Sequence, residues 1–338
     1  MQKIFEVNLI TRPRRFGKTL LMNMLSEFFD IRKDSRALFE GLEISKNKQL
    51  CCIWQNQWPV LFLTLKSVEG LKFDSAYGML EAVISELCVE HFYLAESQVV
   101  NPVHREIFLR LAKKTASEEE IKNSLYTIMA MMQTHYGKRV ILLVDEYDVP
   151  LAKASENGYY KQMLDVIRGI LGRVLKGNSS LEFSVVTGCL RIAKESIFTG
   201  TNNFVSDTIS GRRFERYFGF TEKEVRELLE NTGFSEYKNE VKLWYDGYLF
   251  GREKIYCPWD VLNYINSLQD NPDAKPENYW KNTSHNGIIR SFIDRTDLAV
   301  NEKFEVLLAG GIIRERIEED LTYDVLHSSE ETCGAFYI

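Results

Sequence analysis

Short apolar runs alternate with helical patterns along the first part of the chain. Four runs are rich in apolar and β-branched residues and have the length of buried parallel strands. They cover residues 4–10, 59–65, 140–144 and 183–187. After the first and third runs, apolar residues recur at the spacing of an amphipathic helix, as Leu21, Leu25 and Phe28 do. The alternation predicts an α/β fold in which crossover helices flank a parallel sheet.

Two further regions have helical patterns. Residues 71–136 are mostly helical by pattern, with a break at Asn101-Pro102, and we expect these helices to cover or extend the sheet. Later in the chain, Thr221 and Glu224 have the spacing of a capping box at a helix start. We therefore expect a domain boundary just before this helix, with a first domain over residues 1–218 and a smaller, mostly helical second domain over residues 219–338.

Composition is ordinary for a globular protein and excludes several classes. The chain has 338 residues, 45% of them hydrophobic and 27% charged, which favours two packed units over global disorder. A formal net charge of -6 argues against a surface that grips a phosphate backbone over its whole extent. No apolar run approaches the roughly 18 residues of a membrane span, and no signal peptide is evident. We expect a cytoplasmic protein without a membrane partner.

The cysteines do not suggest a metal site. The sequence has six of them, without a C-x-x-C pair or a His-Cys cluster at metal-ligand spacing. We expect buried thiols in a reducing compartment and no zinc. The six are Cys51, Cys52, Cys88, Cys189, Cys257 and Cys333.

A phosphate-binding pattern follows the first predicted strand and opens the next helix. Residues 12–19 read RPRRFGKT. In such a P-loop, glycine lets the backbone approach the phosphates, N–H groups at the helix start bind them, lysine neutralises their charge and threonine ligates Mg²⁺. The usual pattern begins with glycine, where this chain has arginine; the alternative is an ordinary strand-to-helix turn. The residues expected to bind nucleotide are Arg12, Arg14, Arg15, Phe16, Gly17, Lys18, Thr19 and Leu20.

The third predicted strand ends in adjacent carboxylates, in the sequence VILLVDEYD at residues 140–148. The carboxyl end of a strand is where α/β proteins place ligand chemistry. We expect Asp145, with Thr19, to hold Mg²⁺ and Glu146 to orient and polarise the attacking water. We interpret Asp148 as a turn or helix-capping residue. The alternative is a solvated acidic turn after a buried strand.

Polar residues also follow the fourth predicted strand. Thr187 lies at its carboxyl end, and we expect it to sense a γ-phosphate or to position water if this strand adjoins the third. The alternative is a hydroxyl that only satisfies backbone groups. Arginines able to stabilise transition-state charge are Arg191, Arg212, Arg213 and Arg216, although an arginine is more often solvated or salt-bridged.

Together these segments resemble a known family, the AAA-ATPase-like proteins, which often carry a C-terminal PD-(D/E)XK nuclease-like domain. The resemblance extends nearly end to end. It is carried by RPRRFGKT, VILLVDEYD, VVTGCLRIAKESIF (185–198) and WYDGYLFG (244–251), and by YCPWDVLNYI (256–265) and YWKNTSHN (279–286), which are similar to the family's second domain. It implies an AAA-type P-loop ATPase domain followed by a helical lid or winged-helix-like domain, and it explains Arg12 as the family's form of the loop.

Two departures from the family affect the expected activity. The chain begins almost at its first strand and ends before any nuclease-like domain, so we expect a truncated form without nuclease activity. The pair Glu253-Lys254 lies in a turn-rich stretch and is interpreted as solvated. The aromatic segment at residues 244–248 is interpreted as a tight turn flanked by packed aromatics.

The sequence therefore predicts an AAA-type ATPase that uses ATP and Mg²⁺ to drive a conformational change. ATP is preferred over GTP because no guanine-reading N-K-x-D segment is present. AAA-type sites commonly receive an arginine from a second subunit, so a homo-oligomer is one expected partner. The alternative is a module that binds nucleotide without turnover, in a regulatory or scaffold role, or that contacts nucleic acid through its arginines.

Overall fold

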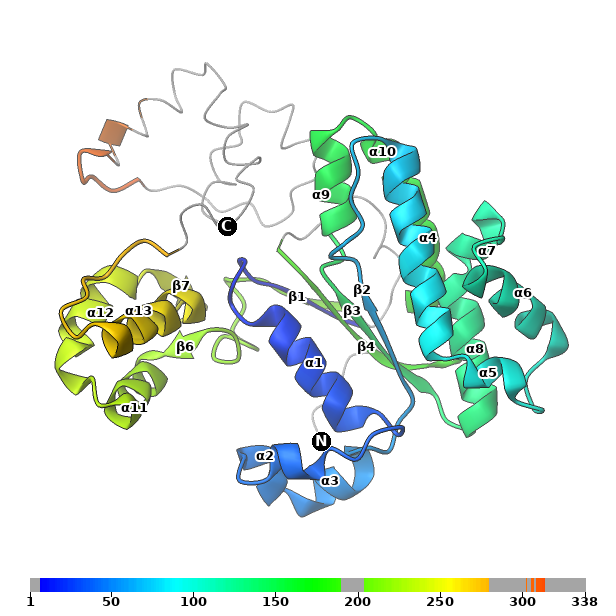
Figure 1. The fold of residues 1–338 in the computed structure, drawn as a ribbon, viewed down its shortest axis with the longest axis horizontal. Coiled ribbons are helices and arrows are strands. Elements are labelled where there is room, and N and C mark those ends of the chain that lie inside the picture. The colour runs from blue at the N-terminus through cyan, green and yellow to red at the C-terminus, as the bar shows by residue number, and fades with distance from the viewer. Residues whose placement is uncertain (1–6, 190–203, 280–301, 303–304, 307, 314–338) are drawn as a thin grey trace. The chain divides into compact units, whose positions relative to one another are not determined.

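The computed structural model describes residues 7–189, 204–279, 302, 305–306 and 308–313, and the chain divides into two compact units (Figure 1). The first unit contains Met1–Thr11 and Lys18–Ser206, and the second contains Arg12–Gly17 and Asp207–Ile338. The loop that joins the first strand to the first helix therefore packs with residues far along the chain. The domain boundary expected between residues 218 and 219 stays a prediction.

The first unit is built on a five-stranded sheet with the strand order β2-β3-β4-β1-β5. Its strands are β1 (Val7–Thr11), β2 (Val60–Thr64), β3 (Val140–Asp145), β4 (Leu181–Gly188) and β5 (Phe204–Asp207). The pairs β2–β3, β3–β4 and β1–β4 are parallel. Every residue of β3 is buried, as in a strand covered on both faces. The α/β P-loop NTPase-like fold and the four predicted strands are confirmed, except that residues 4–6 of the first predicted strand lie outside the described residues.

Helices cover this sheet from both sides. α1 (Lys18–Phe29) packs against β2 and β3, whereas α8 (Ser124–Tyr136) and α10 (Tyr160–Leu175) pack on each other, α8 also on β3 and α10 also on β4 (Figure 1). The crossover from β1 to β2 runs along the sheet in the opposite direction to those from β2 to β3 and β4, so right-handed connections place the two sets on opposite faces. The other α-helices described in this unit are α2 (Glu43–Lys46), α3 (Lys48–Trp54), α4 (Phe73–Glu90), α5 (Tyr93–Glu96), α6 (Pro102–Ala112), α7 (Glu118–Lys122) and α9 (Val149–Glu156).

Local sequence signals set several helix ends. The predicted break at Asn101-Pro102 is confirmed as the start of α6: Asn101 Oδ1 accepts a hydrogen bond from the Val103 N–H at 2.9 Å, and proline occupies the first helical position. α8 ends at Gly137, whose φ of 66° is the left-handed conformation of a common helix C-cap. The region between β2 and β3 is mostly helical, as predicted.

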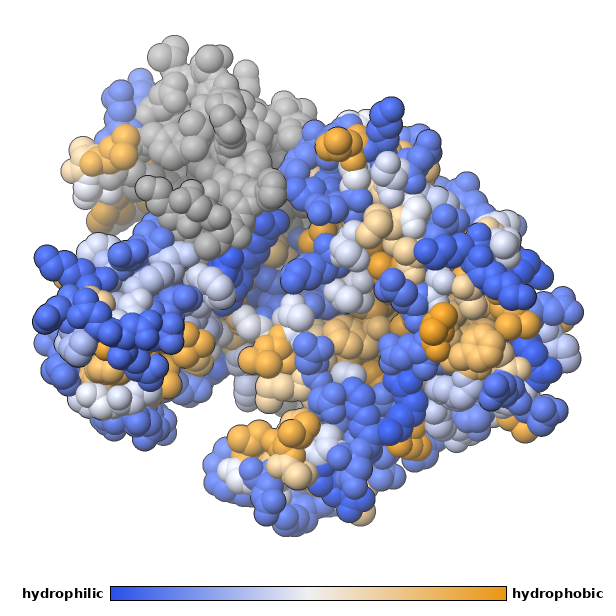
Figure 2. Space-filling view, in the orientation of Figure 1, coloured by the Kyte–Doolittle hydropathy of each residue, from blue (hydrophilic) through white to orange (hydrophobic). Residues whose placement is uncertain are grey.

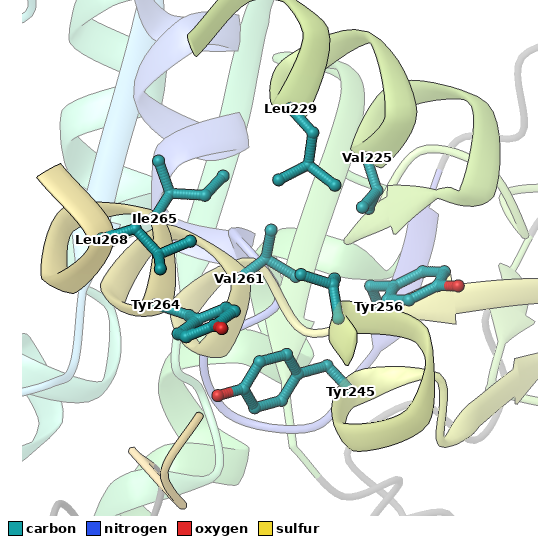
Figure 3. Packing of buried hydrophobic residues seen from close by; sticks show 9 residues of the cluster. Val225, Leu229, Tyr245, Tyr256, Val261, Tyr264, Ile265 and Leu268 are labelled. Atoms are coloured by element: carbon teal, nitrogen blue, oxygen red, sulfur yellow. The ribbon is translucent and has the colours of Figure 1, made fainter. Parts of the chain in front are cut away.

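The second unit contains helices and a small antiparallel sheet with the order β6-β8-β7. Its elements are β6 (Phe220–Thr221), α11 (Glu222–Thr232), α12 (Lys238–Tyr245), β7 (Tyr248–Phe250), β8 (Glu253–Tyr256) and α13 (Pro258–Asp270). The predicted capping box is confirmed, because Thr221 Oγ1 accepts from the Glu224 N–H at 3.3 Å and Glu224 Oε2 accepts from the Thr221 N–H at 2.8 Å. A hydrophobic core of the second unit is drawn in Figure 3 and comprises Val225, Leu229, Val241, Tyr245, Tyr256, Val261, Tyr264, Ile265 and Leu268.

The expectation for the pair Glu253-Lys254 needs correction. Glu253 and Lys254 are not in a turn but begin β8, and they form ion pairs with Arg216 and Asp246. This hairpin is stabilised by the antiparallel pairing of β7 with β8 and by the tyrosines of the second-unit core. The short polar sequence between the two strands does not indicate these contacts. Thr221 and the helix that it caps lie next to the same strand.

The cysteine expectation holds in part. Cys88 and Cys257 are buried, Cys51 and Cys189 are half-buried and Cys52 is exposed. Cys52 lies on α3, a short helix with no buried residue, so its thiol has no core to enter. Cys333 lies outside the described residues.

Exposed apolar residues gather near α2 and α3 in the first unit (Figure 2). They include Leu38, Leu42 and Ile53, with 66%, 43% and 44% of their surface exposed. Trp54 holds α3 to the unit through edge contacts with Phe29 and Phe183. Within the described part of the chain, no helix is long and apolar enough to cross a bilayer.

Candidate nucleotide-binding site

The sheet brings the predicted polar residues to one edge. β4 lies between β1 and β3, and its Thr187 is in register with Ile10 of β1. On the other side of β3, Asp145 is in register with Thr64. All these strands are parallel, so their carboxyl ends meet at the same edge, where α/β folds bind ligands. The condition set for Thr187, that its strand adjoin the acidic strand, is therefore met.

The Asp145 side chain is the centre of the hydrogen-bond network at this edge. It is fully buried, and its two oxygens accept hydrogen bonds from Thr19 Oγ1 at 2.7 Å and from Thr187 Oγ1 at 2.5 Å. A buried carboxylate without donors would be destabilising by several kcal/mol or would take up a proton. The two hydroxyls thus link the ends of β3 and β4 to the first turn of α1.

Glu146 has an unusual backbone conformation. Its φ is 54°, in the left-handed region that non-glycine residues rarely occupy. The chain is held on both sides of it: the Asp145 carbonyl accepts from the Leu65 N–H at 3.0 Å, and the Tyr147 N–H donates to the Thr187 carbonyl at 3.1 Å. Strain of this kind costs about 1–3 kcal/mol and is concentrated at functional sites.

The environment of Glu146 also changes its acidity. Burial raises the pKa of its carboxyl group above the ordinary value of 4.5, and the neighbouring charge of Asp145 raises it further. Lys18 and Lys66 oppose this rise in pKa because their positive charges favour the ionised form. A carboxylate whose pKa moves toward neutrality is better matched to the work of a general base.

Lys18 lies at the first position of α1 and is only 5% exposed. Its Nζ lies 3.5 Å from the Sγ of Cys189, the residue after β4. The Cys189 N–H in turn donates to Asp148 Oδ2 at 2.9 Å. Asp148 occupies the N-cap position of α9 but makes no side-chain cap hydrogen bond, so its carboxylate serves to tie β4 to the turn after β3. No local pattern in the sequence indicates the roles of Cys189 and Lys66, because each acts on a residue far away in the chain.

The loop before α1 places its arginines differently from a set of phosphate ligands. The Arg12 side chain is fully buried and forms an ion pair with Asp207 at 2.6 Å. Arg15 has a φ of 72°, and its guanidinium carbon lies 3.9 Å above the ring centre of Trp259. Phe16 is 1% exposed. Among the residues expected to contact the nucleotide, the Arg12 and Phe16 side chains are thus committed to packing, because aromatic and acidic partners from the second unit surround them.

The remaining candidates differ in exposure and in their contacts. Arg14 and Leu20 are exposed, the latter by 65%. Among the candidate arginines, Arg212 and Arg213 are exposed, and Arg216 forms an ion pair with Glu253. Arg191 lies outside the described residues.

The residues present fit a magnesium-nucleotide ligand. Thr19 and Asp145 supply the hydroxyl and carboxylate oxygens that Mg²⁺ prefers. The described residues contain no group of three or more His, Cys, Asp or Glu side chains able to hold a metal. A Cβ at Gly17, with φ 79°, would meet nothing within 4 Å, so its backbone is open to a phosphate.

Fold and edge residues together define a P-loop NTPase-like protein. The chain belongs to the AAA-ATPase-like family: residues 1–198, more than half of its length, match the family model described as "Predicted AAA-ATPase". ATPase-like function is supported at the level of this family.

A protein of Azotobacter chroococcum mcd 1, described as an uncharacterized protein in the vnfD 5' region, is 27% identical over 277 residues. The match covers 81% of this chain and 46% of that protein, so the chain spans less than half the length of this relative. No solved structure matches the chain significantly.

The tight packing after β4 leads to a prediction for Gly188. A Cβ there would lie 2.6 Å from the Tyr147 ring and 2.7 Å from Asp148 Oδ1, and Tyr147 is fully buried. We expect Gly188→Ala to lower the free energy of unfolding by about 1–3 kcal/mol. The control is Gly172→Ala on α10, where a Cβ meets nothing within 4 Å and the helix should gain up to about 1 kcal/mol. Urea denaturation followed by circular dichroism measures both, and equal stability of the two variants would contradict the packing.

Proposed function

We propose that this chain binds Mg-ATP and hydrolyses it at the edge formed by β3, β4 and the start of α1. The observation that carries the proposal is the buried Asp145 carboxylate, which accepts hydrogen bonds from both Thr19 and Thr187. An ordinary strand-to-helix turn has no need to join its threonine to a buried aspartate 126 residues away. A phosphate loop with a magnesium-binding carboxylate needs this arrangement.

Each residue at this edge has a proposed role. Backbone N–H groups at Gly17 and the start of α1 bind phosphate oxygens, and Lys18 neutralises their charge. Thr19 and Asp145 hold magnesium, which when bound neutralises charge on the phosphates. Glu146 accepts the proton of the attacking water, and Thr187 holds the Asp145 carboxylate in place. The family description supports the ATPase assignment, and the strained backbone of Glu146, with the upward direction of its pKa, favours hydrolysis over binding alone.

ATP hydrolysis is proposed to have a mechanical consequence for the protein. We propose a conformational change driven by ATP turnover, with Arg212 or Arg213 acting on the nucleotide of a second copy of the chain. Both side chains are exposed, which leaves them accessible to a partner. Turnover per subunit would then rise with protein concentration.

Lys18→Ala should weaken nucleotide binding about 10- to 100-fold, because a charge-assisted contact with phosphate is lost. Titration with a fluorescent ATP analogue measures the effect. The control is Lys161→Ala, which removes an equal charge from the exposed side of α10 and should leave affinity unchanged. Equal affinity of wild type and the Lys18 variant would remove the phosphate-loop assignment.

Glu146→Gln should retain nucleotide binding and slow hydrolysis about 10²- to 10⁴-fold, since the amide keeps the shape of the side chain but cannot take up the proton. Phosphate release at saturating ATP and nucleotide affinity are measured on the same preparation. If the variant hydrolyses ATP at the wild-type rate, another residue activates the water. If neither protein hydrolyses ATP, the chain is a nucleotide-binding module without turnover.

The raised pKa of Glu146 predicts the pH dependence of turnover. The base must be ionised, so the rate should fall as the pH drops through this raised pKa, and the acidic limb should lie above pH 4.5. Lys66→Gln removes a positive charge that lowers this pKa, so the acidic limb should move to higher pH. Lys161→Gln is the control with the same change in net charge. Rates are measured at saturating ATP, and nucleotide binding at each pH shows that the protein is intact; an identical limb in all three proteins would exclude Glu146 as the titrating base.

A further inference from the structure

The buried guanidinium of Arg12 is held by Asp207, the last residue of β5, where the second unit begins, and by aromatic rings of that unit. Nη1 donates to the Asp207 carbonyl at 3.0 Å, and Nη2 donates to Asp207 Oδ2 at 2.6 Å. The guanidinium carbon also lies 5.2 Å from the ring centres of both Phe218 and Phe250. Arg12 is among the largest fully buried side chains of the described residues. A fully buried arginine is rare and is found paired.

Two more residues of the loop are anchored in the same unit. The Phe16 ring lies edge-on to Tyr248 at 4.8 Å and close to Phe250 at 5.1 Å. A Cβ at Gly219 would come within 2.9 Å of Phe16, so glycine is needed there for the ring to fit. The Arg15 carbonyl accepts a weak hydrogen bond from Cys257 Sγ at 3.9 Å.

Anchors at both ends fix the course of the loop. Arg12 and Phe16 are separated by three residues, one of which is Pro13, whose ring restricts the backbone further. Immediately after Phe16 come Gly17 and the first turn of α1, whose N–H groups are the proposed phosphate ligands. The course of the loop up to Gly17 therefore depends on the pairing of Arg12 with Asp207.

We propose that Asp207 is a positioning residue for nucleotide binding and acts through Arg12 on the phosphate loop. This role rests on the proposed function, because it requires that the loop bind nucleotide. It differs from the role of phosphate ligand that the sequence suggested for Arg12. To reach a phosphate, the guanidinium would have to leave a buried carboxylate and two aromatic rings, which gives the present arrangement a large energetic advantage.

The test is a double-mutant cycle read as affinity for a fluorescent ATP analogue. Asp207→Asn should weaken binding about tenfold, and Arg12→Met by a similar factor, because each breaks the buried ion pair between the two side chains. The double variant Arg12→Met with Asp207→Leu removes both charges and should bind more tightly than either single variant. If Arg12 contacted the phosphate itself, the double variant would bind no more tightly than Arg12→Met, and the proposal would be overturned.

Controls separate positioning from a loss of folded protein. Asp246→Asn breaks a 3.1 Å ion pair with Lys254 in the same unit and should retain wild-type affinity. Arg12→Lys keeps the positive charge but cannot form the two parallel hydrogen bonds of a guanidinium. It replaces Arg12→Met in the experiment if that variant does not fold. The affinity of Arg12→Lys for the ATP analogue should lie between those of wild type and Asp207→Asn.

Steady-state kinetics give the second readout. In Asp207→Asn, KM for ATP should rise about tenfold while kcat stays within about twofold, whereas partial unfolding would lower kcat and leave KM unchanged. Wild-type affinity and KM in Asp207→Asn would overturn the positioning role alone. Absence of nucleotide binding by the wild-type chain would instead overturn the proposed function, and the positioning role with it.

Discussion

The candidate site depends on keeping one carboxylate both buried and hydrogen-bonded. Asp145 has no exposed surface, and the structure meets its need for donors with two hydroxyls, one from the start of α1 and one from the end of β4. An unsatisfied buried acceptor costs about 1–3 kcal/mol, and a charged one costs more. That penalty exceeds the worth of most surface contacts, so the relative positions of β3, β4 and α1 are set by this residue more than by any exposed ion pair.

The same strand end gives two adjacent carboxylates different environments. Asp145 is enclosed by hydroxyl donors, whereas Glu146 is turned away by a left-handed backbone and is only partly buried. The strain at Glu146 persists because the peptide groups on both sides of it are hydrogen-bonded to Leu65 and Thr187. One carboxylate is therefore suited to fixed metal binding and its neighbour to proton transfer, a division that two acidic residues on a solvated turn would not maintain.

Sequence periodicity predicted those elements whose signal is local. The four apolar strands, the helix of Leu21 and Leu25, and the capping box at Thr221 each rest on residues close together in the chain, and each is confirmed. β5 was missed because FVSD has only two apolar residues and is defined by pairing with β1. The sequence predicts which residue types form the candidate site, from Gly17-Lys18-Thr19 and Asp145-Glu146. The partners that fix their geometry lie 126 residues away for Thr19 and 171 for Lys18, and no local pattern encodes them.

The arginine at the start of the loop is the clearest case of a long-range determinant. A glycine is usual at that position because the loop must turn tightly. Here Arg12 does not adopt a positive φ, and the left-handed positions of the loop are Arg15 and Gly17. A left-handed arginine costs about 1–2 kcal/mol, which stacking of Arg15 on Trp259 helps to offset. With no conformational demand for glycine at residue 12, a large side chain is tolerated there, and it can pair with Asp207. In this loop, the pairing of Arg12 with Asp207 thus stabilises a backbone course that other phosphate loops obtain from a glycine at the same position.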